Sequence, residues 1–142
     1  MPRKMTATER EAYLAALHVG IISIEAGSGR APLAVPIWYA YEPGGLVTVL
    51  TGATTEKAKL IAAAGRFSLT VQDEAPAYKY ATASGPVVDI VELATPAERL
   101  VLAQRYLGTE GGAAYVEATG PHPNSAIRMR PESWRTSDYS ED

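Results

Sequence analysis

The sequence predicts a mainly β protein, an antiparallel barrel of about six or seven strands with three or four short helices around it. Three observations support this class. Short apolar or alternating segments typical of strands follow one another along most of the chain. Most are joined by glycine- and proline-rich turns, which suit hairpins and not the helical crossovers of a parallel sheet. The longest strand, residues 78–91, contains a Gly-Pro pair, as a strand that bends at a barrel corner would.

Composition restricts the function. The 142 residues are expected to form one domain, residues 1–142, with a core of its own. The chain has no cysteine and only two histidines, which argues against disulfides, thiol catalysis and a histidine-rich metal site. Its net charge of −3 argues against a nucleic-acid binder. No apolar run approaches the roughly 20 residues of a membrane span, and no signal-peptide pattern is visible, so we expect a cytoplasmic protein without a membrane partner.

Two threonines predict the first helix. Thr6 and Thr8 are each followed three residues later by glutamate, and either pair fits a capping box. Residues 20–25 are then expected as a strand, and the glycine-rich residues 26–29 as a hairpin turn. His18 has no partner carboxylate or nucleophile close in the sequence, which favours a structural or surface role over a catalytic one.

Residues 30–42 are expected as a longer extended segment with one apolar face. Pro36 lies on the other face and cannot donate a ladder hydrogen bond, so the segment should lie at a sheet edge or in a bulge, with neighbouring backbone groups left free. Trp38 beside it offers a flat apolar surface, although a core or interface position is the commoner fate of tryptophan. Alternate residues share a face of the segment: Leu33, Val35, Ile37, Tyr39 and Tyr41 on one side, and Ala34, Pro36, Trp38 and Ala40 on the other.

Residues 46–72 are predicted to form a strand, a polar turn, a short helix that Gly65 ends, and a second strand. Lys57 and Lys59 fall at the start of that helix, where unpaired backbone N–H groups and the helix dipole already attract an anion. Lysines there oppose the dipole unless an anion such as a phosphate binds both of them. The alternative is that they are ordinary solvated lysines.

The rest of the chain adds a second capped helix and two strands. Thr95, followed by proline and then by glutamate at the third position, predicts a helix start, and Gly108 its end. A softer helix is expected over residues 113–118, and strands over residues 125–130 and 134–138. No Ser/His/Asp set, catalytic carboxylate pair or metal motif emerges. The residues themselves therefore indicate binding of a flat, anionic ligand, and none is assigned a catalytic or metal-binding role.

The order and spacing of several short motifs resemble the pyridoxamine-phosphate-oxidase-like flavin and deazaflavin oxidoreductases, in particular their actinobacterial branch that uses coenzyme F-420. The motifs are Pro-Ile-Trp-Tyr from residue 36, the pair Lys57 and Lys59, Arg-Phe-Ser-Leu from residue 66, Gly-Pro-Val-Val from residue 85, Arg-Tyr-Leu-Gly from residue 105, and Ile-Arg-Met-Arg-Pro-Glu-Ser-Trp from residue 127. The resemblance covers nearly the whole chain.

This resemblance implies a split β-barrel of the FMN-binding type, a Greek-key barrel that forms a homodimer with two cofactor sites at the interface. The lysine pair would hold the cofactor phosphate, in agreement with the argument from the helix start, and the proline-containing strand would line the flavin-type ring. Thr51 on the adjoining strand and Tyr78 at the start of the long strand would complete the site. Trp134 near the C-terminus would contribute to the site of the partner chain. The cofactor-binding residues so predicted are Val35, Pro36, Ile37, Trp38, Thr51, Lys57, Lys59, Tyr78 and Trp134.

The function implied is that of an oxidoreductase that binds F-420 and transfers hydride to an unsaturated or conjugated organic substrate, with the cofactor supplying the chemistry. The alternatives are the same barrel using FMN, and a non-catalytic cofactor- or ligand-binding protein on this fold. The F-420 tail is longer and more acidic than that of FMN, so further basic residues such as Arg66, Lys79 or Arg128 should flank the groove if F-420 is bound. Glu56 stands where relatives often carry arginine. The C-terminal segment lacks the arginine and histidine of true pyridoxamine-phosphate oxidases, which disfavours vitamin B6 oxidation.

Overall fold

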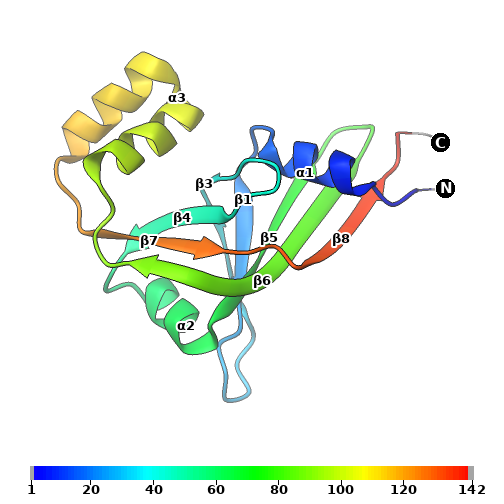
Figure 1. The fold of residues 1–142 in the computed structure, drawn as a ribbon, viewed down its shortest axis with the longest axis horizontal. Coiled ribbons are helices and arrows are strands. Elements are labelled where there is room, and N and C mark those ends of the chain that lie inside the picture. The colour runs from blue at the N-terminus through cyan, green and yellow to red at the C-terminus, as the bar shows by residue number, and fades with distance from the viewer. Residues whose placement is uncertain (1, 141–142) are drawn as a thin grey trace.

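The computed structural model describes residues 2–140 and shows a strongly curved antiparallel sheet of eight strands with three helices on its outside (Figure 1). Among these residues, no helix is long and apolar enough to cross a membrane. The helices are α1 (Ala7–Ala15), α2 (Glu56–Ala64) and α3 (Pro96–Thr119). The strands are β1 (Gly20–Ile24), β2 (Leu33–Ile37), β3 (Tyr39–Ala40), β4 (Val47–Gly52), β5 (Arg66–Asp73), β6 (Lys79–Val91), β7 (Asn124–Met129) and β8 (Ser133–Asp138).

The strand order is β2-β1-β5-β6-β7-β4-β3, with β8 beside β6, and the strand pairs are antiparallel. This confirms the predicted mainly β, antiparallel class, and the curled sheet is that of a split barrel. The described residues hold one strand more than the six or seven expected, because the extended segment is divided at Trp38 into β2 and β3.

The long strand β6 bends the sheet where the Gly-Pro pair predicted a corner. Its first half pairs with β5 and β8, and its second half pairs with β7 after a register shift between Val87 and Asp89. A Cβ atom on Gly85 would lie 1.8 Å from the carbonyl oxygen of Arg130. The backbone segments around these two residues can therefore approach this closely only because residue 85 is a glycine. One strand therefore serves both halves of the barrel.

The barrel is open between β2 and the end of β4. β2 pairs with β1, and Pro36 lies opposite Ile21 in that ladder. β3 then pairs with β4 through Tyr39 and Val49. Continued backwards, this register would set Ile37 against Thr51, but within residues 2–140 no ladder joins these positions. Pro36 thus belongs to an edge strand, as predicted, and backbone groups along the split have no strand partner among the described residues.

The core fills the barrel. The predicted grouping of alternate residues of the extended segment on one face is confirmed, and this face turns inward: Ile37, Tyr39 and Tyr41 are buried, and Leu33 and Val35 pack against the core. Each fully buried large side chain contributes about 1.5–3 kcal/mol relative to an exposed position. The fully buried side chains also come from α1, α2 and the other strands, and include Leu14, Ile22, Ile61, Leu69, Ile127 and Met129.

The predicted helix ends are confirmed. Thr6 and Thr95 are N-caps with complete capping boxes, and Thr55 caps α2, which ends at Gly65 in the left-handed conformation (φ 70°). Gly108 interrupts α3 with φ 81° and ψ 172°, so α3 consists of two helical arms that fold into a hairpin beside the barrel (Figure 1). The second arm is longer than the softer helix predicted over residues 113–118.

Candidate functional site

The start of α2 is fixed to the end of β4 by a chain of hydroxyl groups. Thr55 Oγ1 accepts a hydrogen bond from Ala58 N (3.2 Å) and donates one to Gly52 O (2.9 Å). The buried Thr51 places its Oγ1 3.3 Å from Thr55 Oγ1. The site residue predicted on β4 therefore supports the helix end that carries the lysine pair.

Lys57 and Lys59 are the basic side chains of this helix end. Lys57 is half-buried and Lys59 is exposed. Within residues 2–140 neither forms a salt bridge. The cap leaves the first backbone N–H groups of the helix available to an anion. Two cationic side chains without a carboxylate partner, next to the positive end of a helix dipole, fit a phosphate group.

An arginine offsets the acidic residue at the same helix end. Arg30, from the hairpin between β1 and β2, lies with its Nη2 2.7 Å from Glu56 Oε1. Both side chains are mostly exposed, at 59% and 61%, so the pair adds little to stability but does reduce the negative potential beside Lys57. Sequence reasoning missed Arg30, which directly follows the glycine-rich turn. Nothing in the sequence of that turn indicates that the Arg30 side chain will reach the start of α2.

The four predicted residues of the extended segment present different groups to the split. The side chains of Val35 and Ile37 turn toward the core, so only the backbone atoms of these two residues can contact a ligand in the split. The side chain of Pro36 is exposed. Trp38 is half-buried and turns toward α3, where it stacks on Tyr106 with ring centroids 4.9 Å apart and planes 9° apart. One face of this indole is therefore covered by the chain's own helix.

Tyr78 and Trp134 lie in another part of the sheet, at the neighbouring strands β6 and β8. Tyr78 is 51% exposed and directly precedes β6, whose first residues lie at the end of the sheet away from α2 (Figure 1). Trp134, on β8, packs under the guanidinium of Arg10 (4.9 Å from its ring centroid) and against Tyr41. A role for Trp134 in a site of the partner chain stays a prediction.

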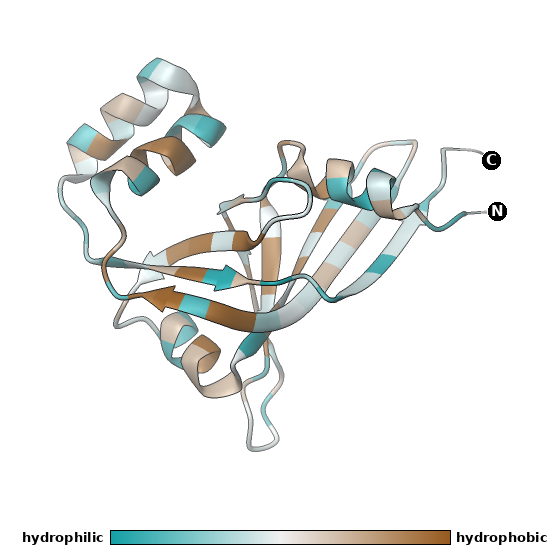
Figure 2. Cartoon of the chain, in the orientation of Figure 1, coloured by the Kyte–Doolittle hydropathy of each residue, from teal (hydrophilic) through white to brown (hydrophobic). Residues whose placement is uncertain are grey.

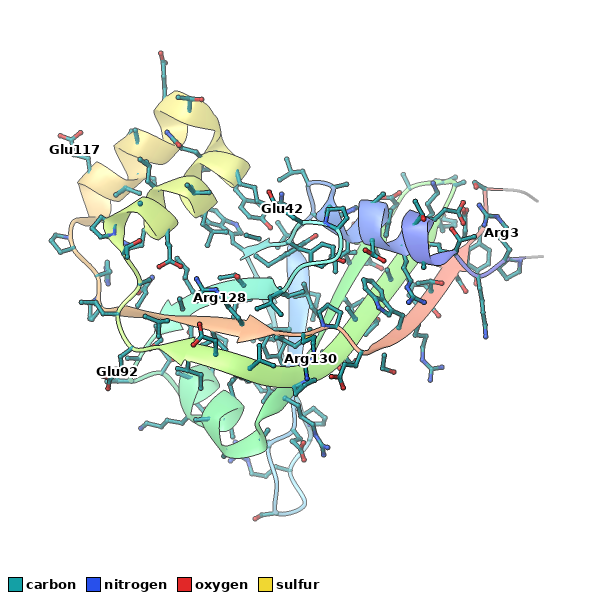
Figure 3. All side chains as sticks on the ribbon, in the orientation of Figure 1. Arg3, Glu42, Glu92, Glu117, Arg128 and Arg130 are labelled. Carbon is teal, nitrogen blue, oxygen red and sulfur yellow. The ribbon has the colours of Figure 1, made fainter. Side chains whose placement is uncertain are left out.

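The further cations expected along an F-420 groove are mostly engaged with carboxylates. Arg66 Nε lies 2.7 Å from Glu25 Oε1. Arg128, on β7, bridges to Asp89 at 3.3 Å and to Glu98 at 2.5 Å, and Figure 3 shows it beneath α3. A cleft of about 710 Å³ runs past Arg66 at the far end of α2. In the described part of the chain, no three histidine, aspartate or glutamate side chains gather in a way that could hold a metal ion.

The curled antiparallel sheet with its open seam defines the fold as a split β-barrel. No protein-family model and no curated protein matches the chain. Among solved structures, an F-420 reductase has a TM-score of 0.70 and 24% identity over 88% of this chain and 94% of that chain. An FAD-binding protein from Mesorhizobium loti has a TM-score of 0.67 and 21% identity over 97% of this chain and 98% of its own. A protein from Corynebacterium glutamicum, provisionally assigned as a pyridoxamine 5'-phosphate oxidase, has a TM-score of 0.61 and 11% identity, covering 98% and 94%.

At these identities the likeness establishes the fold. The resemblance predicted from the ordered motifs is thereby confirmed at that level, for the split barrel that the pyridoxamine-phosphate-oxidase-like proteins share.

Proposed function

We propose that the chain binds the deazaflavin coenzyme F-420 and transfers hydride to an unsaturated or conjugated organic substrate. The observation that carries the proposal is the lysine pair at the start of α2, which has no carboxylate partner among residues 2–140 and stands beside the open seam of the barrel. The fold shared with an F-420 reductase supports it.

The protein's part in such a reaction is to hold and orient. Lys57, Lys59 and the free N–H groups of the first turn would bind the phosphate, and Arg30 would keep the Glu56 carboxylate from repelling it. The free edge of β2 would offer backbone hydrogen bonds to the ring along the split. When bound, the deazaflavin itself supplies the hydride chemistry.

We further propose that the chain acts as a homodimer. Apolar side chains are exposed at the C-terminal end of β6, where Val88, Ile90 and Val91 are 41%, 48% and 38% exposed and Leu93 follows at 63%. Figure 2 shows the hydrophobic colour gathered at this end of β6. A second copy of the chain would cover these side chains and would bring its own Trp134 toward the site.

A specific observation favours FMN as the second candidate. Arg66 and Arg128, which an acidic F-420 tail would need free, already pair with carboxylates, and Lys79 lies at the start of β6, away from α2. The shorter FMN needs only the phosphate site. The third candidate is a non-catalytic cofactor-binding protein on the same fold. Such a protein would bind the reduced cofactor but would not oxidise it when conjugated substrates are added.

The experiment is a side-by-side calorimetric titration of the protein with F-420 and FMN. Lys57→Ala should weaken the cofactor that binds by about 1.5–3 kcal/mol, or roughly 10- to 150-fold, because a charged hydrogen bond to phosphate is lost. Lys4→Ala removes the same charge near the N-terminus, is exposed, and should leave the affinity unchanged.

Tight, Lys57-dependent binding of F-420 supports the first proposal, and preference for FMN moves the chain to the second. Binding of neither cofactor, or equal binding by the Lys57→Ala protein, contradicts both.

A further inference from the structure

The hairpin α3 is joined to the barrel near its turn, through Tyr106 and Arg105, and at its start, where Glu98 pairs with Arg128 of β7. Tyr106 OH donates to His18 O (2.6 Å) and accepts from Tyr39 N (3.1 Å), while its ring stacks on Trp38. Arg105 adds a hydrogen bond from Nη2 to Ala16 O (2.9 Å). Toward the open ends of its two arms, the hairpin leaves a cavity of about 260 Å³ between itself and β4.

The walls of this cavity are aromatic and aliphatic. Trp38 and Tyr115, whose ring centroids are 5.7 Å apart, line it together with Leu50, Leu102 and Val116. Binding sites for small ligands are typically apolar with a few convergent polar groups, and this volume lies just below the usual range for drug-sized ligands. The walls therefore suit a small, flat, conjugated molecule.

The polar groups of the cavity are cationic or neutral. Arg99, His122, Asn124 and Thr119 line it, and no carboxylate does. Arg99 is half-buried, donates from Nη2 to Thr119 Oγ1 (3.3 Å), and has no salt bridge within residues 2–140. Glu117, which follows Val116 in the second arm, points away from the barrel (Figure 3). In a chain of net charge −3, a cavity without an acidic lining residue favours an anionic ligand.

We propose that this cavity binds a small conjugated carboxylate, such as an aromatic or enoic acid, with Arg99 pairing with its carboxylate and Trp38 and Tyr115 holding its planar part. Leu50 directly precedes Thr51 of the candidate cofactor site, and Asn124 pairs with Gly52, so the two sites share one end of β4. That this acid is the substrate class of the enzyme rests on the proposed function, whereas the binding itself does not.

The test follows the indole N–H resonances of the two tryptophans by NMR while cinnamate is added to the full chain without cofactor. Trp38 lies in the cavity and Trp134 packs against Arg10 and Tyr41 elsewhere, so one resonance reports the site and the other is an internal control. We expect a saturable shift of the Trp38 resonance alone, and at least about tenfold weaker binding of the neutral cinnamamide.

Two variants separate the charge from the shape of the cavity. Arg99→Met should weaken cinnamate binding at least about tenfold, and Arg99→Lys should recover part of it. Val116→Phe keeps Arg99 and fills the cavity, and should abolish the Trp38 shift. Lys57→Ala should leave cinnamate binding intact even where it removes cofactor binding, so failure of this site and failure of the proposed function give different results. A Trp38 shift that does not saturate, equal binding of acid and amide, or wild-type affinity in Arg99→Met would each overturn the proposal.

Discussion

Trp38 and Tyr106 stack with their ring centroids 4.9 Å apart and their planes 9° apart, and this contact joins the strand beside the split to the hairpin α3. The same tyrosine hydroxyl bonds to backbone atoms of His18 and Tyr39. Tyr106 therefore holds α3 over β3 and β4, together with Arg105 and the pair of Glu98 and Arg128.

Tyr106→Ala should lower the free energy of unfolding by about 2–4 kcal/mol, since it removes a packed aromatic ring and leaves Tyr39 N without its partner. Tyr106→Phe keeps the stacking and should cost only about 1–2 kcal/mol. Urea denaturation followed by circular dichroism measures both. Equal losses in the two variants would show that the ring contact contributes nothing.

The pair of Arg30 and Glu56 should affect ligand binding more than stability, because both side chains are largely exposed. Glu56→Gln removes a negative charge beside the lysine pair and should tighten binding of the phosphate-bearing cofactor by about two- to fivefold. Arg30→Ala should weaken it by a similar factor, and both effects should shrink at high salt. Calorimetry at two salt concentrations measures this, with Glu74→Gln in the loop after β5 as control. No change in either variant would place the cofactor phosphate elsewhere.

The homodimer proposal predicts that Ile90→Glu dissociates the protein into monomers, because a charge buried at the end of β6 would have no partner. Sedimentation velocity measures the change in mass. Leu17→Glu makes the same exchange at another exposed apolar residue and should leave the dimer intact. A wild-type protein that sediments as a monomer would refute the proposal outright.

Acid should destabilise the start of α3. The backbone hydrogen bond from Thr95, together with Arg128, lowers the pKa of Glu98 below its usual value. A carboxylate whose pKa is lower in the folded protein stabilises it above the unfolded pKa, and this contribution is lost as the pH falls through the folded pKa. Between about pH 7 and about pH 3, Glu98→Gln should therefore lose less stability than the wild type does. Chemical denaturation at both values measures the difference, and equal losses would show that Glu98 makes no such contribution.

The sequence by itself determined the local elements of this protein. Three kinds of local feature were predictable: the helix caps at Thr6, Thr55 and Thr95, the alternation from Leu33 to Tyr41, and the bend at the Gly-Pro pair. Each depends on hydrogen bonds or burial within a few residues, so the local sequence is enough to predict it. The lysine pair was visible for the same reason, because its position relative to a helix start is a local property.

Only the tertiary structure decided which distant residues meet. Arg30 reaches Glu56 from the hairpin between β1 and β2, Tyr106 covers one face of Trp38, and Arg99 and Leu50 line one cavity. These contacts depend on how the sheet curls and where α3 docks. The barrel's split likewise follows from the pairing of β2 with β1 and of β3 with β4, which no single segment encodes. Such contacts arise from packing between segments far apart in the chain, and local propensity carries no information about them.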